Sequence, residues 1–229
     1  MLKLVGKDLL AARWILLCGA AVLSLYSLQP FFSAGFILAA GGALALAGQA
    51  TVFFLEDRNK TEILYLSLPV SRASIVGARY LLGAVLLAAG GAMVFGIIGW
   101  AGALMHVPRP AGGFPGLLSI EAAALFFPLT AFFLSLYLPF YHRFGFGRGT
   151  LLFTAAGVLC AALGAAGLKA ALSDAFASGG GEAVIFGAVR VLRLSLGTPL
   201  FVLAAAAAVF IPFLVSLFLS TRFYARREF

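Results

Sequence analysis

Long apolar runs separated by short polar stretches constrain the fold of this chain more than any other feature. Hydropathy and chain breakers divide the sequence into six such runs, at about 14–29, 31–55, 80–105, 118–140, 150–170 and 198–220. A helix of about 20 apolar residues crosses a bilayer core about 30 Å thick. Charged residues make up only 10% of the chain and its mean hydropathy is +1.09, whereas soluble domains carry about 25% charged residues. The sequence therefore predicts an all-α integral membrane protein with six transmembrane helices, folded as a single domain over residues 1–229.

The basic residues predict the orientation of these spans. Of the 16 Lys and Arg residues, four (Arg109, Lys169, Arg190 and Arg193) fall on the side opposite the N-terminus, which leaves 12 on the side of the N-terminus. Because Lys and Arg are retained on the cytoplasmic side, both termini are expected in the cytoplasm of a multi-pass protein of the cell membrane. The basic residues form no tract with interleaved aromatic residues, so the net charge of +8 reflects membrane topology and predicts no nucleic-acid partner.

Two segments outside the spans have amphipathic patterns. Residues 2–13 place Leu2, Val5 and Leu9 on one helical face and Lys3 and Lys7 opposite, which predicts an N-terminal helix lying along the inner membrane surface. The alternative is a solvated extension of the first span.

The outer segment 171–197 is the second. After the glycine-rich break SGGGE (178–182), it carries Glu182, Arg190 and Arg193 on one helical face, which indicates an interfacial or re-entrant helix.

The second and third spans are rich in glycine and alanine, at 39–50 and 83–102. Small residues allow helix backbones to approach closely in lipid. These spans are therefore expected either in the interior of one chain or at an interface between two chains.

Several kinds of chemistry have no signature in the sequence. The nearest glycine-rich stretch, FGFGRGT (144–150), lacks the lysine of a nucleotide-binding loop, so this chain is not expected to hydrolyse ATP. His106 and His142 lie in connecting loops, where they are expected to be solvated or interfacial, and no metal-ligand spacing includes them. We expect no catalytic residues and no metal site, so the chain has no visible energy source of its own: it needs a partner, or it is passive.

Charge is concentrated in the segment between the second and third spans. Five of the 24 charged residues, Glu56, Asp57, Arg58, Lys60 and Glu62, fall within seven positions. The pattern predicts a short helix from Glu56 to Leu68 that ends at Pro69, with Ser71 capping a second helix that enters the third span. Such a tip suits docking into a groove of a soluble partner. The alternative is a solvated hairpin that only maintains the topology.

The run EDRNKTEILYLSLPVSRASIVGARYL (56–81) resembles the corresponding segment of permease subunits of type-2 ATP-binding cassette exporters, above all the small bacterial permeases with six spans. In that family a polar stretch of mixed charge leads into an LLxSLPVSR-like run and then a helix that returns to the membrane. Leu64 and the run Ser67–Arg72 occupy the matching places, and Tyr65 stands where leucine is common. The coupling segment so identified covers residues 56–79.

The resemblance implies a set of partners and site residues. A coupling helix seated on a separate ATP-binding cassette ATPase subunit would comprise Glu56, Asp57, Arg58, Lys60, Thr61 and Glu62. An elbow formed by Pro69, Ser71 and Arg72 would follow it. Two copies of the ATPase subunit would bind ATP and Mg, while this chain holds no cofactor, and a second permease chain, identical or related, would complete a dimer in the lipid bilayer.

The substrate is expected to be amphipathic or hydrophobic. The fourth span contains the aromatic cluster LFFPLTAFFLSLYLPF (125–140), and Glu121 lies near the outer end of that span. Glu121, Phe126 and Phe127 are therefore candidate residues of the substrate path, with lipid-facing aromatics and an interfacial glutamate as the alternatives. The predicted function is export of a peptide, antimicrobial agent or lipid; the alternative function is a membrane-embedded accessory or sensor protein that binds a soluble partner without transport.

Overall fold

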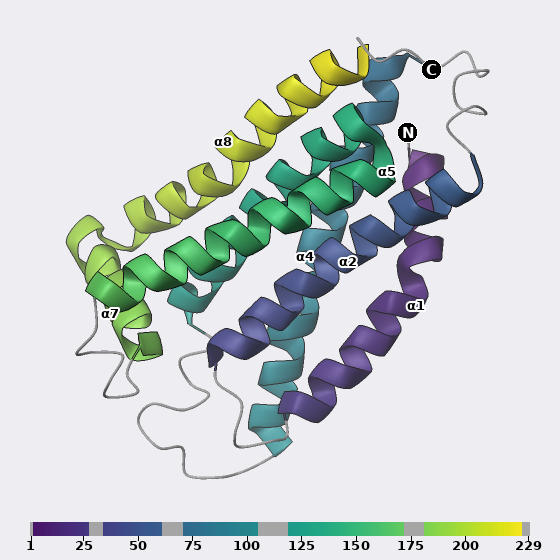
Figure 1. The fold of residues 1–229 in the computed structure, drawn as a ribbon. Helices are drawn as coiled ribbons and strands as arrows, with labels where there is room; N and C mark the ends of the chain where they lie inside the picture. Colours follow the sequence, from purple (N-terminus) through teal and green to yellow (C-terminus); the bar gives the residue numbers. More distant parts are fainter. Residues whose placement is uncertain (1, 28–33, 61–70, 105–118, 172–180, 226–229) are drawn as a thin grey trace.

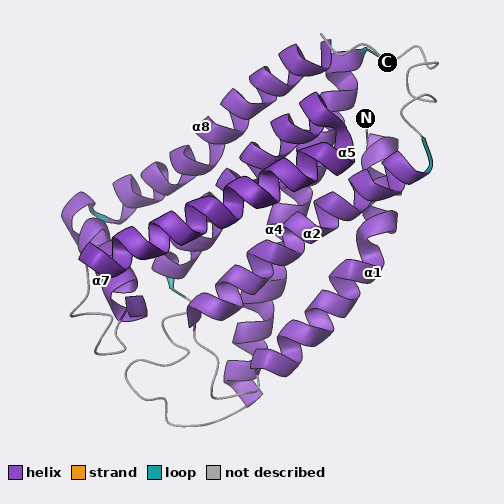
Figure 2. Ribbon diagram, in the orientation of Figure 1, coloured by secondary structure: helices purple, strands orange, loops and turns teal. Residues whose placement is uncertain are grey.

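The computed structural model describes residues 2–27, 34–60, 71–104, 119–171 and 181–225, and these residues form helices without any strand (Figure 2). The helices are α1 (Leu2–Ser27), α2 (Ala34–Arg58), α4 (Arg72–Leu104), α5 (Ile120–Ala171), α7 (Gly181–Leu196) and α8 (Thr198–Ala225). The predicted all-α class is confirmed.

The helices run between two ends of the molecule (Figure 1). The start of α1, the end of α2, the start of α4, the middle of α5 and the end of α8 meet at one end, which we call the terminal end. The helix α7 and the start of α8 lie at the opposite end. Both ends of the described chain therefore lie on the same side, as an even number of membrane crossings requires.

The helix α5 consists of two helices joined at Gly145, whose backbone has φ 77° and ψ −178°. Its second part folds back along its first, because Tyr137 contacts both Thr150, at 3.2 Å between hydroxyl oxygens, and the ring of Phe153. A positive φ of this size favours glycine. The two parts correspond to the predicted spans 118–140 and 150–170.

The turn of α5 contains a pair of glycines that provides a test of this packing. A Cβ atom at Gly149 would lie 2.8 Å from the carbonyl oxygen of Phe140, a backbone atom that cannot move aside, whereas a Cβ at the exposed Gly147 meets nothing within 4 Å. We expect Gly149→Ala to reduce the free energy of unfolding by about 1–3 kcal/mol. Gly147→Ala should leave it unchanged or slightly higher. Thermal unfolding in mild detergent measures both, and equal midpoints would contradict the close contact.

Four helical stretches of the described residues are long and apolar enough to cross a membrane, namely Phe36–Arg58, Arg72–Ile97, Ile120–Gly157 and Thr198–Ala225. Together they establish a multi-pass membrane protein. The count of six spans stays a prediction. It requires that α1 also crosses the membrane and that the two parts of α5 are separate spans.

The N-terminal segment differs from the separate surface helix predicted for residues 2–13. It forms the first half of α1, which continues without a break to Ser27. Ala12, Leu16 and the carboxylate of Asp8 are buried. Packing against α2 and α4 therefore makes this segment part of the helix bundle.

The small residues of α2 and α4 allow close packing within the chain. A Cβ at Gly90 would lie 3.4 Å from the carbonyl oxygen of Gly41, and one at Gly41 would overlap the side chain of Val94. The adjoining core contains Ile37, Leu87, Val94, Phe126 and Leu134. The small residues therefore allow these two spans to contact each other inside one chain.

The outer segment predicted at 171–197 contains α7, which turns directly into α8 at Gly197 (φ 77°). Its residues 172–180 lie outside the described ranges. At 16 residues, α7 is shorter than a typical span of about 20 residues.

Candidate functional site

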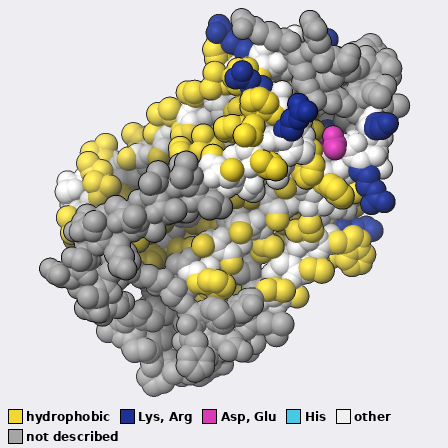
Figure 3. All heavy atoms as spheres, in the orientation of Figure 1, with side chains coloured by type: hydrophobic (Ala, Val, Ile, Leu, Met, Phe, Trp, Pro, Cys, Tyr) yellow, Lys and Arg dark blue, Asp and Glu magenta, His cyan; other side chains and the backbone are white. Residues whose placement is uncertain are grey.

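The charged turn after α2 is exposed at the terminal end. Asp57 and Arg58 complete the last turn of α2, and Lys60, with a φ of 49°, closes a turn in which its N–H donates to the carbonyl of Asp57 at 3.2 Å. The side chains of Asp57, Arg58, Asn59 and Lys60 are all exposed. Figure 3 shows Lys and Arg side chains gathered around this end, while apolar side chains cover the flank of the bundle.

Glu56 differs from its charged neighbours because its side chain points into the protein. It is 7% exposed and forms an ion pair with Arg79 of α4, which also pairs with Asp8 of α1. Arg79 and Asp8 are each 2% exposed. The hydroxyl of Tyr141 donates to the second oxygen of Glu56 at 3.5 Å. We call Asp8, Glu56 and Arg79 the ion network.

The ion network holds three helices together directly below the charged turn. A buried charge is tolerated only when it is paired and hydrogen-bonded, and one guanidinium has enough N–H groups to serve two carboxylates. Any displacement of the end of α2 therefore acts on α1 and α4.

An aromatic layer extends this junction to α5 and α8. The ring of Phe53 stacks on Tyr141 with 3.6 Å between centroids, and the ring of His142 meets Tyr224 edge-on at 5.5 Å. His142 is 1% exposed, so the prediction that it is solvated or interfacial is wrong. The turn at Gly145 brings it under the end of α8 instead of leaving it in a loop.

Polar contacts also join α4 to α8. The hydroxyl of Tyr80 lies 2.5 Å from the hydroxyl of Ser216 and 2.7 Å from that of Ser220. At the terminal end, Arg72 donates to the carbonyl oxygen of Ala225 at 3.1 Å. The start of α4 is thereby fixed to the end of α8.

The predicted coupling helix and elbow are described only in part. Thr61, Glu62 and Pro69 lie outside the described residues. The prediction that a separate helix begins at Glu56 is wrong, because that residue and the next two complete α2. Glu56 also does not lie at the exposed tip, because its side chain is buried and its carboxylate pairs with Arg79. Ser71 caps α4 as predicted, accepting a hydrogen bond from the N–H of Ser74 at 3.2 Å.

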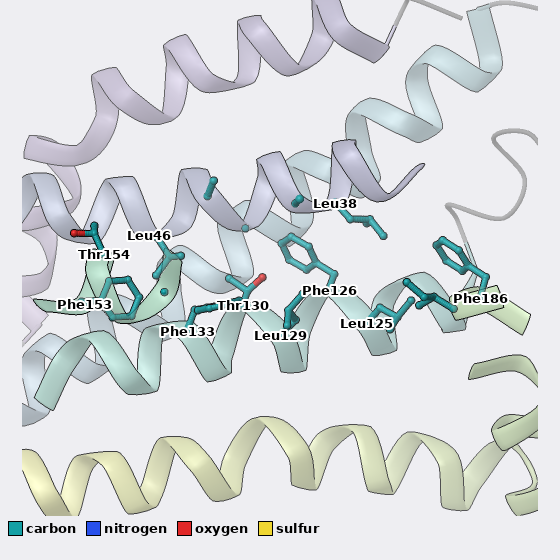
Figure 4. A pocket seen from close by; sticks show the side chains of 15 residues that line it. Leu38, Leu46, Leu125, Phe126, Leu129, Thr130, Phe133, Phe153, Thr154 and Phe186 are labelled. Atoms are coloured by element: carbon teal, nitrogen blue, oxygen red, sulfur yellow. The ribbon is translucent and has the colours of Figure 1, made fainter. Parts of the chain in front are cut away.

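A second candidate site is an apolar cavity of about 500 Å³ on the flank of the bundle. It lies between α2, both parts of α5, and α7, and its lining includes Leu38, Leu125, Phe133, Phe153 and Phe186 (Figure 4). The lining residues Ala39, Ala43 and Leu129 are exposed. The cavity therefore lies at the surface of the described part of the bundle.

The structure separates the three residues predicted for a substrate path. Phe126 lines the cavity, but Phe127 lines a different groove between α5 and α8. Glu121 forms an ion pair with Arg193 of α7 at 3.1 Å. Because α5 is a helix, adjacent residues face different directions, so Phe126 and Phe127 line different cavities, although their rings meet edge-on with 5.2 Å between centroids.

The ion network and the cavity were both missed by sequence reasoning. The signal for the network was a position: Arg79 is followed by Tyr80 and a long apolar run, well inside a helix that starts at Arg72. Its partners, 71 and 23 residues away in sequence, have no local signature. Within the described ranges, no group of three His, Cys, Asp or Glu side chains lies close enough to hold a metal ion.

The chain was compared with known protein families, curated proteins and solved structures. A family described as "ABC-2 family transporter protein" matches residues 3–225. No curated protein and no solved structure matches the chain. The match covers nearly the whole chain and confirms the resemblance found in the coupling segment.

Proposed function

The chain belongs to the ABC-2 family of transporter proteins, and on that premise we propose that it works as the permease of an exporter, driven by ATP that a separate subunit hydrolyses. The observation that carries this proposal is the exposed charged turn, which lies directly on the buried ion network. A turn that only maintained topology would need no such rigid support. In this arrangement a partner that moves the turn also moves α1, α2 and α4.

The docking residues of this proposal are those exposed beyond the ion network. Asp57, Arg58 and Lys60 present mixed charge at the terminal end, and Thr61 and Glu62 continue the same segment. Charge of both signs sets the register of a contact and excludes wrong partners. Glu56 acts from inside, since its pairing with Arg79 connects the docking turn to the bundle.

The energy enters through the partner. Two copies of an ATPase subunit hold ATP and Mg, and nucleotide shifts the permease between inward-open and outward-open packings through its different affinity for the two states. The terminal end faces the cytoplasm, as the distribution of Lys and Arg predicts. A second permease chain, identical or related, completes the transport unit.

The substrate of this proposal is hydrophobic or amphipathic, such as a peptide, an antimicrobial agent or a lipid. The support is the apolar cavity on the flank, where Thr130 and Thr154 are the only polar side chains among the described lining residues. The hydroxyl of Thr154 donates to the carbonyl of Thr150 in its own helix at 2.9 Å. The lining therefore favours apolar groups over polar ones.

Co-purification tests the proposed function. The tagged chain, produced together with the products of its neighbouring genes, should retain a stoichiometric ATP-binding subunit in mild detergent, and the complex should hydrolyse ATP. A chain that purifies alone and without ATPase activity, in several detergents that keep it folded, would contradict the permease role and favour an accessory or sensor protein.

A further inference from the structure

We propose that the apolar cavity between α2, α5 and α7 binds an acyl chain of an anionic lipid, and that Arg190 recognises its headgroup. This inference names a ligand class for the cavity. It rests on the proposed function only in placing the cavity at the outer leaflet of the membrane. The apolar interior of the cavity suits the acyl chain, and the charged side chains at its mouth suit an anionic headgroup.

The length and the apolar lining of the cavity suit an acyl chain. Its wall on α5 extends from Leu125 to Phe133, which is about 12 Å at 1.5 Å per residue. The cavity has a volume of about 500 Å³. A flexible chain of methylene groups can follow this apolar wall.

Charged side chains lie at the outer mouth of the cavity. On α7, Phe186 lines the cavity, and Arg190 and Arg193 follow on the same helical face at spacings of four and seven residues. On α5, Glu121 lies one turn above Leu125, which lines the cavity. The ion pair between Glu121 and Arg193, at 3.1 Å, connects these two walls.

Among the side chains that the structure describes, the mouth has one positive charge in excess. The charges of Arg193 and Arg190 both act on Glu121, but Arg193 alone forms an ion pair with it. Arg190 is exposed, and the side chains that the structure describes include no ion-pair partner for it. A phosphate group at the membrane surface provides the missing anion.

Selectivity must come from the headgroup. Acyl chains in a bilayer are as apolar as leucine, so moving one into the cavity gains little from the hydrophobic effect. One arginine near the surface of an anionic membrane favours binding by about fivefold. The cavity should therefore take chains from phosphatidylglycerol in preference to chains from phosphatidylcholine.

Photolabelling in membranes tests the proposal with the full chain. The probes are phosphatidylglycerol and phosphatidylcholine, each with a diazirine at the end of one acyl chain. Labelling of residues 125–133 is compared with labelling of the exposed α8 residues Ile211, Leu214, Val215 and Phe218, which reports general contact with lipid. We expect phosphatidylglycerol to label the cavity about fivefold more than phosphatidylcholine, with no such preference on α8.

Two pairs of variants separate the cavity from its charge. Gly157→Phe fills the cavity from a position where a Cβ meets nothing within 4 Å, and Gly96→Phe is its control, equally unobstructed but on α4 and outside the lining. Only Gly157→Phe should reduce labelling of residues 125–133 to the level of α8. Arg190→Gln should remove the preference for phosphatidylglycerol, while Arg148→Gln, exposed at the terminal end, should retain it.

Three outcomes would overturn the proposal. They are equal labelling by both lipids in the unaltered chain, full labelling in Gly157→Phe, and a disulfide between cysteines at Leu129 of two copies without lipid labelling. The last would show a second copy in place of lipid. Because none of these measurements depends on ATP or on the partner subunit, their failure leaves the co-purification result intact, and the two proposals fail separately.

Discussion

Replacing Arg79 by methionine is expected to destabilise the protein more than any other single change at the terminal end. The substitution leaves the carboxylates of Asp8 and Glu56 buried beside each other without their cation. Breaking a buried ion pair by removing one partner costs about 3–5 kcal/mol. The midpoint of thermal unfolding in detergent should therefore fall by roughly 6–20 °C.

Two further variants distinguish loss of the ion network from loss of a cation. Arg148→Met removes an exposed arginine at the same end and should change the midpoint by no more than about 2 °C. The triple variant Asp8→Asn, Glu56→Gln, Arg79→Met removes all three charges and should recover a large part of the loss, because neutral groups of similar shape avoid the buried charges. A triple variant as unstable as Arg79→Met would contradict the electrostatic origin.

Charge reversal at Glu56 and at the neighbouring Asp57 is expected to have different effects. Asp57→Lys reverses an exposed charge of the docking turn, so the midpoint of unfolding should stay within about 2 °C while co-purification of the ATPase subunit falls about tenfold through like-charge repulsion. Glu56→Lys places a cation beside the buried Arg79 and should destabilise the chain itself. Quantitative mass spectrometry of the purified complex and a thermal unfolding curve give both values.

The control for this pair is Arg13→Glu, which reverses an exposed charge on α1 away from the turn. It should change neither the midpoint nor the amount of ATPase subunit recovered. Normal recovery of that subunit with Asp57→Lys, Arg58→Glu and the combination of both would remove the docking role from this turn. Glu56→Lys with the stability of the unaltered chain would argue against a buried ion network.

Some features could be predicted because they depend on local patterns. The Ser71 hydroxyl can cap α4 because it lies three residues before the N–H of Ser74. This cap marks where α4 begins. The break at Gly145 lies between two apolar runs that were recognised as separate spans. Such signals lie within a few residues, where spacing alone decides the structure.

Other features required contacts between distant segments. Glu56 belongs to a run of charges that reads as one exposed helix, yet its carboxylate meets Arg79 and its neighbours' side chains do not. Residues 2–13 have the pattern of a surface helix, but Asp8 is buried because Arg79 comes from α4 to meet it. A helical face is defined by the sequence, while its partner is defined by the packing of the bundle.

The sequence by itself determined that the chain is helical, that it crosses a membrane and that its charge gathers beside one connection, because bilayer thickness and the helical period act on every residue locally. Only the tertiary structure decided that Asp8, Glu56 and Arg79 form one network, that Phe126 and Phe127 line different cavities, and that Arg193 pairs with Glu121 while Arg190 stays exposed. The physical reason is that charge pairing and cavity shape depend on distances between helices far apart in the chain.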